Sequence, residues 1–104
     1  MENTISEIRH FIIGIGYVPV DDLGIDYKLA YISDTTKRRI EFSIRLDTLT
    51  ATAIYEDLEY NKKNPYATRD KRVSYDLKGI VPCGTNFVKH ELTKFMNSVK
   101  GEIE

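Results

Sequence analysis

Apolar and polar side chains alternate without a break over residues 39–47, and this pattern limits what the chain can fold into. The apolar positions are Ile40, Phe42, Ile44 and Leu46. Successive side chains of a β-strand point to opposite faces, so a period of two places the apolar groups on one face and the charges on the other. The pattern predicts a strand in a sheet that is packed on one face and open on the other.

An amphipathic helix is predicted near the N-terminus, because isoleucines recur at spacings of three and four over residues 5–15. Thr4 and Glu7 have the spacing of a capping box, in which each side chain satisfies a backbone N–H of the first turn. Gly14 and Gly16 are expected to end the helix, since glycine readily takes the left-handed conformation found at helix ends.

A second amphipathic helix is predicted over residues 85–103, with Thr85 as its N-cap. Three further segments have the composition of strands, residues 27–33, 49–58 and 73–77. In the strand over 49–58, alternate small residues are expected to face the core and to let a helix approach closely.

The order of these elements is helix, strand, strand, strand, strand, helix. It predicts the α+β class, specifically a two-layer sandwich in which an antiparallel sheet carries both helices on one face. A chain of 104 residues supports one hydrophobic core, and no repeat or low-complexity linker divides it. We therefore expect a single domain covering residues 1–104.

Charge, hydropathy and cysteine content narrow the class of protein. Fifteen Lys and Arg residues balance sixteen Asp and Glu residues for a net charge of -1, so overall charge does not favour nucleic acid as a partner. No apolar run approaches the length needed to cross a bilayer, and we expect no membrane association. Cys83 is the only cysteine, which argues against an oxidising compartment, and we expect a cytoplasmic protein.

No catalytic or metal-binding motif is evident. His10 and His90 fall on the polar sides of the two predicted helices, and Cys83 has no histidine near it in the sequence. We expect Cys83 to be a partly buried, inert thiol. The sequence therefore predicts a protein that is not an enzyme and that needs neither a cofactor nor a metal ion.

The first candidate binding surface is the open face of the sheet. The strand over 27–33 is apolar on both faces, so two registers are open: Tyr27 and Tyr31 face the core, or they join Arg39 and Arg45 on the open face. Exposed Tyr and Arg together are typical of protein interfaces. On the second register we expect these four residues to bind a protein partner, or a second copy of the chain, through the open face or an edge of the sheet.

The second candidate is the loop over residues 59–72, which mixes basic and aromatic side chains with Asn and Pro. Basic side chains can contact phosphates and tyrosine can stack on bases, so the alternative function is a nucleic-acid-binding module. The residues concerned are Lys62, Lys63, Tyr66, Arg69, Lys71 and Arg72. The same composition also suits a solvated hairpin tip.

Overall fold

A computed structural model describes residues 2–68 and 70–104. Its strands are β1 (Val18–Pro19), β2 (Asp26–Ser33), β3 (Arg38–Arg45), β4 (Thr50–Asp57) and β5 (Asp70–Asp76). Its helices are α1 (Glu2–Gly14), α2 (Leu58–Lys63) and α3 (Thr85–Ile103), with a short 3-10 turn, η1 (Val81–Cys83), before α3.

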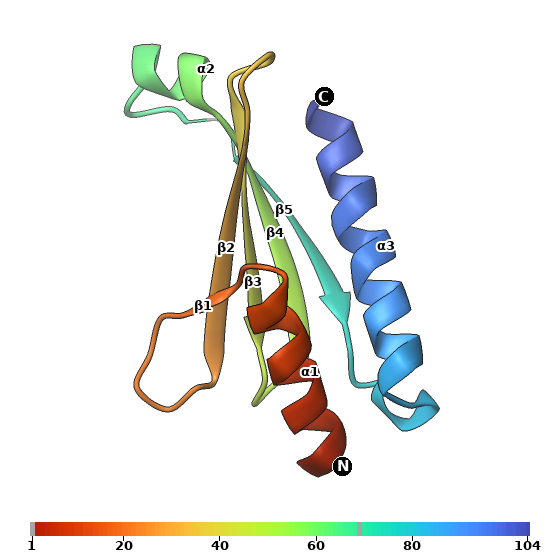
Figure 1. The fold of residues 1–104 in the computed structure, drawn as a ribbon. Helices are drawn as coiled ribbons and strands as arrows, with labels where there is room; N and C mark the ends of the chain where they lie inside the picture. The colour runs from red at the N-terminus through yellow and green to blue at the C-terminus, as the bar shows by residue number, and fades with distance from the viewer. Residues whose placement is uncertain (1, 69) are drawn as a thin grey trace.

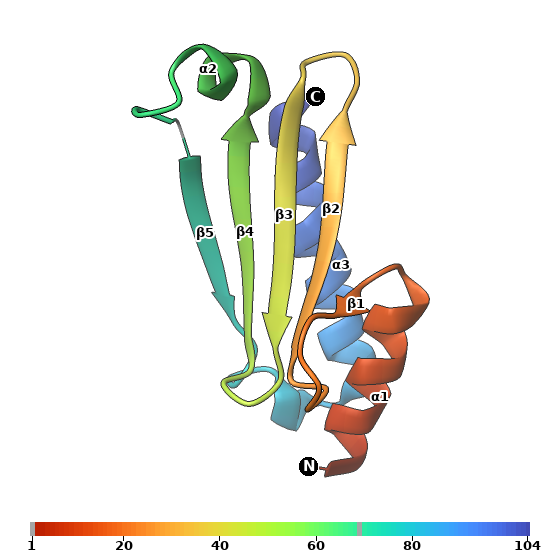
Figure 2. The same ribbon diagram turned by 90° about the vertical axis from the view of Figure 1, so that its left-hand side faces the viewer.

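The strands form one antiparallel sheet in the order β1-β2-β3-β4-β5 (Figure 1). Figures 1 and 2 show α1 and α3 on the same side of this sheet, with α3 behind the strands and α1 beside the β2 edge. The other face of β2 to β5 is open toward the viewer of Figure 2. The predicted α+β class and antiparallel sheet are confirmed.

The alternation in β3 places its apolar side chains in the core. Ile40, Phe42 and Ile44 are all fully buried, and they belong to one cluster with buried side chains from both long helices. In β4 the core positions across from Phe42 and Ile44 are Ala53 and Ala51, both buried. Small residues at these positions leave room for α3, as the sequence predicts.

The register of β2 corrects the expected position of two site residues. Tyr27 lies across from Ile44 and is only 2% exposed, and Tyr31 lies across from Ile40 and packs against the core. Ala30 and Ile32 consequently point to the open face. The register that places the tyrosines outward was wrong, because two tyrosine rings remove more apolar surface from water than Ala30 and Ile32 would.

The ends of the two long helices also differ from expectation. Helix α1 already includes Glu2, so Thr4 lies inside its first turns, and Glu7 accepts a hydrogen bond from the Thr85 hydroxyl instead of closing a capping box. Thr85 is the first residue of α3, and Gly84 precedes it as the cap with φ of 103°. The predicted capping roles of Thr4 and Thr85 were therefore wrong, whereas the predicted end of α1 at Gly14 is confirmed.

Two neighbouring substitutions test the one-sided sheet. Ile44→Asp places a carboxylate in a site that is 0% exposed. Burying this unpaired charge removes several kcal/mol from a free energy of unfolding that is about 5–15 kcal/mol for a typical domain. We expect this variant to be unfolded and Arg45→Ala, on the exposed face, to melt close to the wild type. Thermal melts followed by circular dichroism measure both. Equal losses in melting temperature would contradict the assignment of faces.

Candidate functional site

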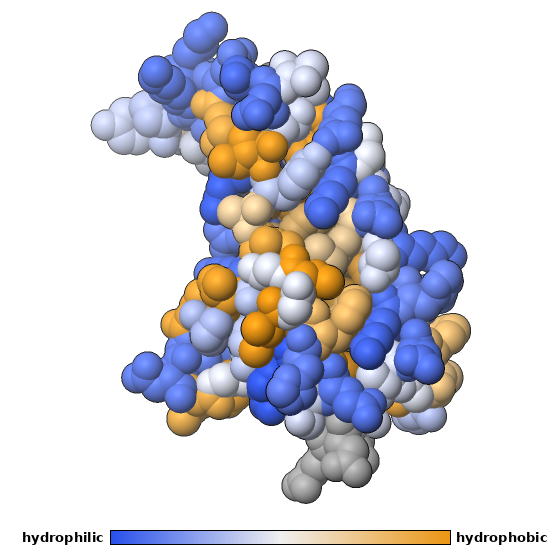
Figure 3. Space-filling view, in the orientation of Figure 1, coloured by the Kyte–Doolittle hydropathy of each residue, from blue (hydrophilic) through white to orange (hydrophobic). Residues whose placement is uncertain are grey.

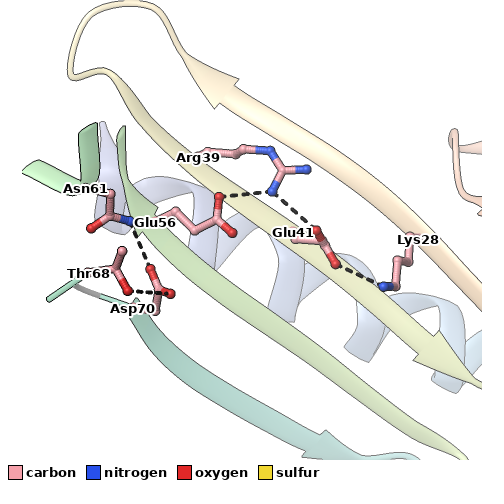
Figure 4. A network of polar contacts seen from close by, with 7 residues as sticks. All are labelled: Lys28, Arg39, Glu41, Glu56, Asn61, Thr68 and Asp70. Carbon is pink, nitrogen blue, oxygen red and sulfur yellow. Dashed lines mark hydrogen bonds and ion pairs between the residues drawn. The ribbon is translucent and has the colours of Figure 1, made fainter. Parts of the chain in front are cut away.

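A ladder of charged side chains crosses the open face of the sheet (Figure 4). The Lys28 ammonium lies 3.2 Å from Glu41, and the Arg39 guanidinium lies 3.3 Å from Glu41 and 3.1 Å from Glu56. These four residues come from three neighbouring strands, so the ladder ties β2, β3 and β4 together across their solvent side. Arg39 is on the open face as predicted, but two carboxylates already occupy its guanidinium.

The ladder changes the acidity of its central carboxylate. Partial burial alone raises the pKa of Glu41, but hydrogen bonds and charge attraction from Lys28 and Arg39 outweigh it and hold the pKa below its ordinary value. Because the folded pKa is depressed, Glu41 stabilises the fold above its unfolded pKa of about 4.3. That stabilisation is lost as the pH falls through the lower, folded pKa.

Arg45, the last residue of β3, forms a separate ion pair with Asp47 on the same face. Its guanidinium donates to both carboxylate oxygens of Asp47, at 3.2 and 3.0 Å, and both side chains are exposed. Asp47 holds the pKa of Arg45 above its ordinary value. Both predicted arginines therefore lie on the open face with anionic partners from their own chain.

The open face is also hollowed. In Figure 3 the outline curves inward on the side of the open face, between α2 at one end and the loop between β1 and β2 at the other. A shallow depression of about 370 Å³ lies on the sheet, lined mainly by hydroxyl and charged side chains that include Arg45 and Arg72.

We expect Arg39→Met to raise the pKa of Glu41, because the carboxylate then keeps Lys28 alone as its cationic partner. An NMR titration of the Glu41 side-chain carboxyl measures this. Arg45→Met is the matched control, since it removes a positive charge from the same face but not from the ladder. An unchanged Glu41 pKa in Arg39→Met would show that the ladder does not form in solution.

The segment predicted as an irregular basic loop contains regular structure. Residues 58–63 form α2, which the Asp57 carboxylate caps by accepting a hydrogen bond from the Tyr60 backbone N–H at 3.0 Å. The strand β5 begins at Asp70, three residues before the expected start. The loop prediction was therefore wrong for most of its length, and Asp57 was the signal that could have indicated the helix.

The basic residues of this segment do not share one surface. Lys62 and Lys63 lie at the exposed end of α2, while Lys71 and Arg72 are neighbours in β5 and point to opposite faces of the sheet. The Lys71 ammonium lies 5.5 Å from the centre of the Tyr55 ring, on the side of the helices. Tyr66 is fully exposed beyond α2, and Arg69 lies outside the described residues.

The outer edge of β2 is covered along only part of its length. The two residues of β1 pair with Tyr27 and Lys28, and the backbone N–H of Val20 donates to the Asp26 carbonyl at 2.9 Å. That bond shows that the even-numbered residues of β2 direct their backbone groups outward, since this direction alternates along a strand. Among the described residues, none pairs with Ala30 or Ile32 on that side.

We call the outer side of Leu29–Ser33 the uncovered β2 edge. Figure 2 shows no element beside the upper half of β2, and Figure 3, which looks onto this edge, shows apolar surface there. The Ile32 side chain is 52% exposed, and no residue of this stretch is charged. A depression of about 400 Å³ adjoins it, bounded by the turn after β2 and by Glu104.

The opposite edge of the sheet is built differently. The seven residues of β5 include the charged Asp70, Lys71, Arg72 and Asp76. Charged side chains on an edge strand oppose the addition of another strand, because pairing would remove them from water. The two edges of one sheet thus differ in whether they resist strand addition.

An open depression of about 830 Å³ lies where the start of α3 meets α1. His10 and Cys83 both line it, although the sequence places them far apart, and His90 does not. Cys83 is exposed, so the expected partial burial of this thiol was wrong. Within residues 2–68 and 70–104, no three His, Cys, Asp or Glu side chains are grouped so that they could hold a metal ion.

Comparisons with known proteins give no further indication of a family. No protein-family model matches the chain, and neither a curated protein nor a solved structure matches it. In the part of the chain that the structure describes, none of the helices has both the length and the apolar character needed to cross a membrane.

Proposed function

We propose that the chain is a small non-enzymatic protein-interaction module, which binds by accepting an extended strand of its partner on the uncovered β2 edge. In this mode of recognition, main-chain hydrogen bonds supply affinity and alternate side chains supply specificity. Ala30 and Ile32 direct their N–H and C=O groups to the solvent, and the Ile32 side chain is half exposed beside them. An exposed cysteine in a chain with only one is compatible with the cytoplasm as the proposed location.

The contrast between the two sheet edges is the observation that carries this proposal. An exposed edge that is uncharged and apolar is a ready template for another strand, and proteins that do not use such an edge blunt it with charge or cover it. In this chain β5 is blunted by charge, and β1 covers the lower part of β2. The stretch Leu29–Ser33 has neither protection.

The proposed role of the open face is smaller than the sequence suggests. Arg39 and Arg45 remain candidates for contacts with the partner, but each would first have to leave a carboxylate of its own chain. The Arg45–Asp47 pair is exposed, so its exchange costs little and adds little affinity, whereas Arg39 is only partly exposed and is held by two carboxylates. We therefore assign the main binding role to the backbone of the edge.

Ile32→Lys and Ser74→Lys form a matched pair for testing this proposal. Each adds one lysine to an edge strand at a position facing the open side of the sheet, the first on β2 and the second on β5. We expect Ile32→Lys to lose the partner, because strand addition would bring its ammonium out of water, and Ser74→Lys to retain it. Affinity capture from a cell lysate, together with sedimentation of the pure protein, measures both forms of association. Equal binding by the two variants would contradict the role of the β2 edge.

Nucleic-acid binding is the second candidate, favoured by the exposed Tyr66 close in sequence to Lys62 and Lys63. If these basic side chains contact phosphates, affinity must fall with salt at about one log unit per contact. Fluorescence anisotropy with labelled RNA and DNA, in single-stranded and duplex form, measures the slope. Changing Lys62 and Lys63 to Ser should reduce both slope and affinity. The absence of binding at low salt would eliminate this candidate.

A further inference from the structure

We infer that the strand accepted by the uncovered β2 edge is the same strand of a second copy of this chain, in an antiparallel pair related by a two-fold axis through Tyr31. This inference rests on the proposed function and names its partner. The pairing of the two β2 strands joins two five-stranded sheets into one continuous antiparallel sheet. Such an interface is isologous, because each copy contributes the same strand.

The backbone selects the position of the axis. Only Ala30 and Ile32 have outward groups in the uncovered stretch, since β1 pairs with Lys28 and the strand ends at Ser33. An axis through Tyr31 pairs Ala30 of each copy with Ile32 of the other, and every such pair exchanges two hydrogen bonds. An axis through Ala30 would pair Ala30 with Ala30 of the second copy, and the next pair would need Lys28, which β1 covers. An axis through Ile32 would pair Ile32 with Ile32, and the next pair would need Asp34, which lies in the turn.

The side chains brought together by this register are complementary. On the open face, the small Ala30 stands beside the large Ile32 of the second copy. The pairing stops at these residues, because β1 covers the next outward residue, Lys28, and β2 ends at Ser33. On the helix face, the two Tyr31 residues stand opposite each other as a non-hydrogen-bonded pair.

The surroundings of Tyr31 hold it ready for this contact. Its hydroxyl donates to the Glu104 carboxylate, and the Lys100 ammonium lies 5.0 Å from the centre of its ring. Both partners belong to the last turn of α3 or follow it directly, so the end of this helix fixes the ring at the edge of the sheet. The net charge of -1 adds little repulsion between two copies.

Sedimentation equilibrium of the purified protein over a range of concentrations is the first test. We expect a dimer, and for Ile32→Lys a dissociation constant raised by at least about tenfold, since symmetry places two ammonium groups in the interface. Ser74→Lys should dimerise like the wild type. Circular dichroism of each variant establishes that it is folded. A wild-type protein that stays monomeric at high concentration would overturn the inference.

Cysteine cross-linking in a Cys83→Ser background tests the register. Opposed residues in a non-hydrogen-bonded pair have Cα atoms about 4.5 Å apart, a separation that a disulfide spans. We expect Tyr31→Cys to form a disulfide-linked dimer under mild oxidation more completely than single cysteines at positions 29, 30, 32 or 33. Ser74→Cys, on the β5 edge, gives the level of random cross-linking. Equal or greater cross-linking at any of these other positions would overturn the proposed axis.

The two experiments separate failure of this inference from failure of the proposed function. A monomeric protein that captures a different polypeptide, and loses it in Ile32→Lys, would overturn the second copy as partner while the edge keeps its binding role. A dimer that Ile32→Lys leaves intact would overturn the inference, because self-association would then use another surface. If Ile32→Lys also leaves the capture of other polypeptides intact, the proposed function is overturned as well.

Discussion

The burial of one side of β3 is the constraint on which the rest of the structure depends. Ile40, Phe42 and Ile44 need an apolar layer against them, and the stripes of α1 and α3 provide it. The residues between them then have to face water on the opposite side of the sheet. The helices, the alanines of β4 and the open face all follow from this single alternation.

The open face meets that constraint by neutralising its own charges. Arg39 stands between Glu41 and Glu56, and each of the three is only partly exposed, so the ladder ties adjacent strands without burying an unpaired charge. A face arranged in this way has little net potential with which to attract an anionic partner. The groups that can still form directional hydrogen bonds with a partner are mainly backbone N–H and C=O groups at the sheet edges, such as those of Ala30 and Ile32.

The sequence predicts the elements whose periodicity is unambiguous and misses those decided by pairing. The alternation in β3 and the apolar stripe of α3 each have only one amphipathic solution, and both predictions hold. The strand over 27–33 is apolar on both sides, so its faces were decided by pairing with β3, which no local pattern of β2 reveals. The helix α2 was missed because Asn and Pro outweighed the cap at Asp57. Among the site residues, the arginines were placed on the correct face and the tyrosines were not.

The side chains of β2 have to pack against the helices on one face and to suit an edge strand on the other. Toward the helices β2 has to supply apolar area, which Tyr27, Leu29 and Tyr31 do. On the solvent side, charged side chains protect an edge strand that has to stay unpaired. Ala30 and Ile32, which face the solvent in β2, are both uncharged. A lysine at position 32 would protect the edge of a monomer from pairing, and it would not disturb the core because that side chain is half exposed. An isoleucine there is consistent with an edge that another strand covers, and the match of Ala30 to Ile32 within the same strand makes a second copy a fitting cover.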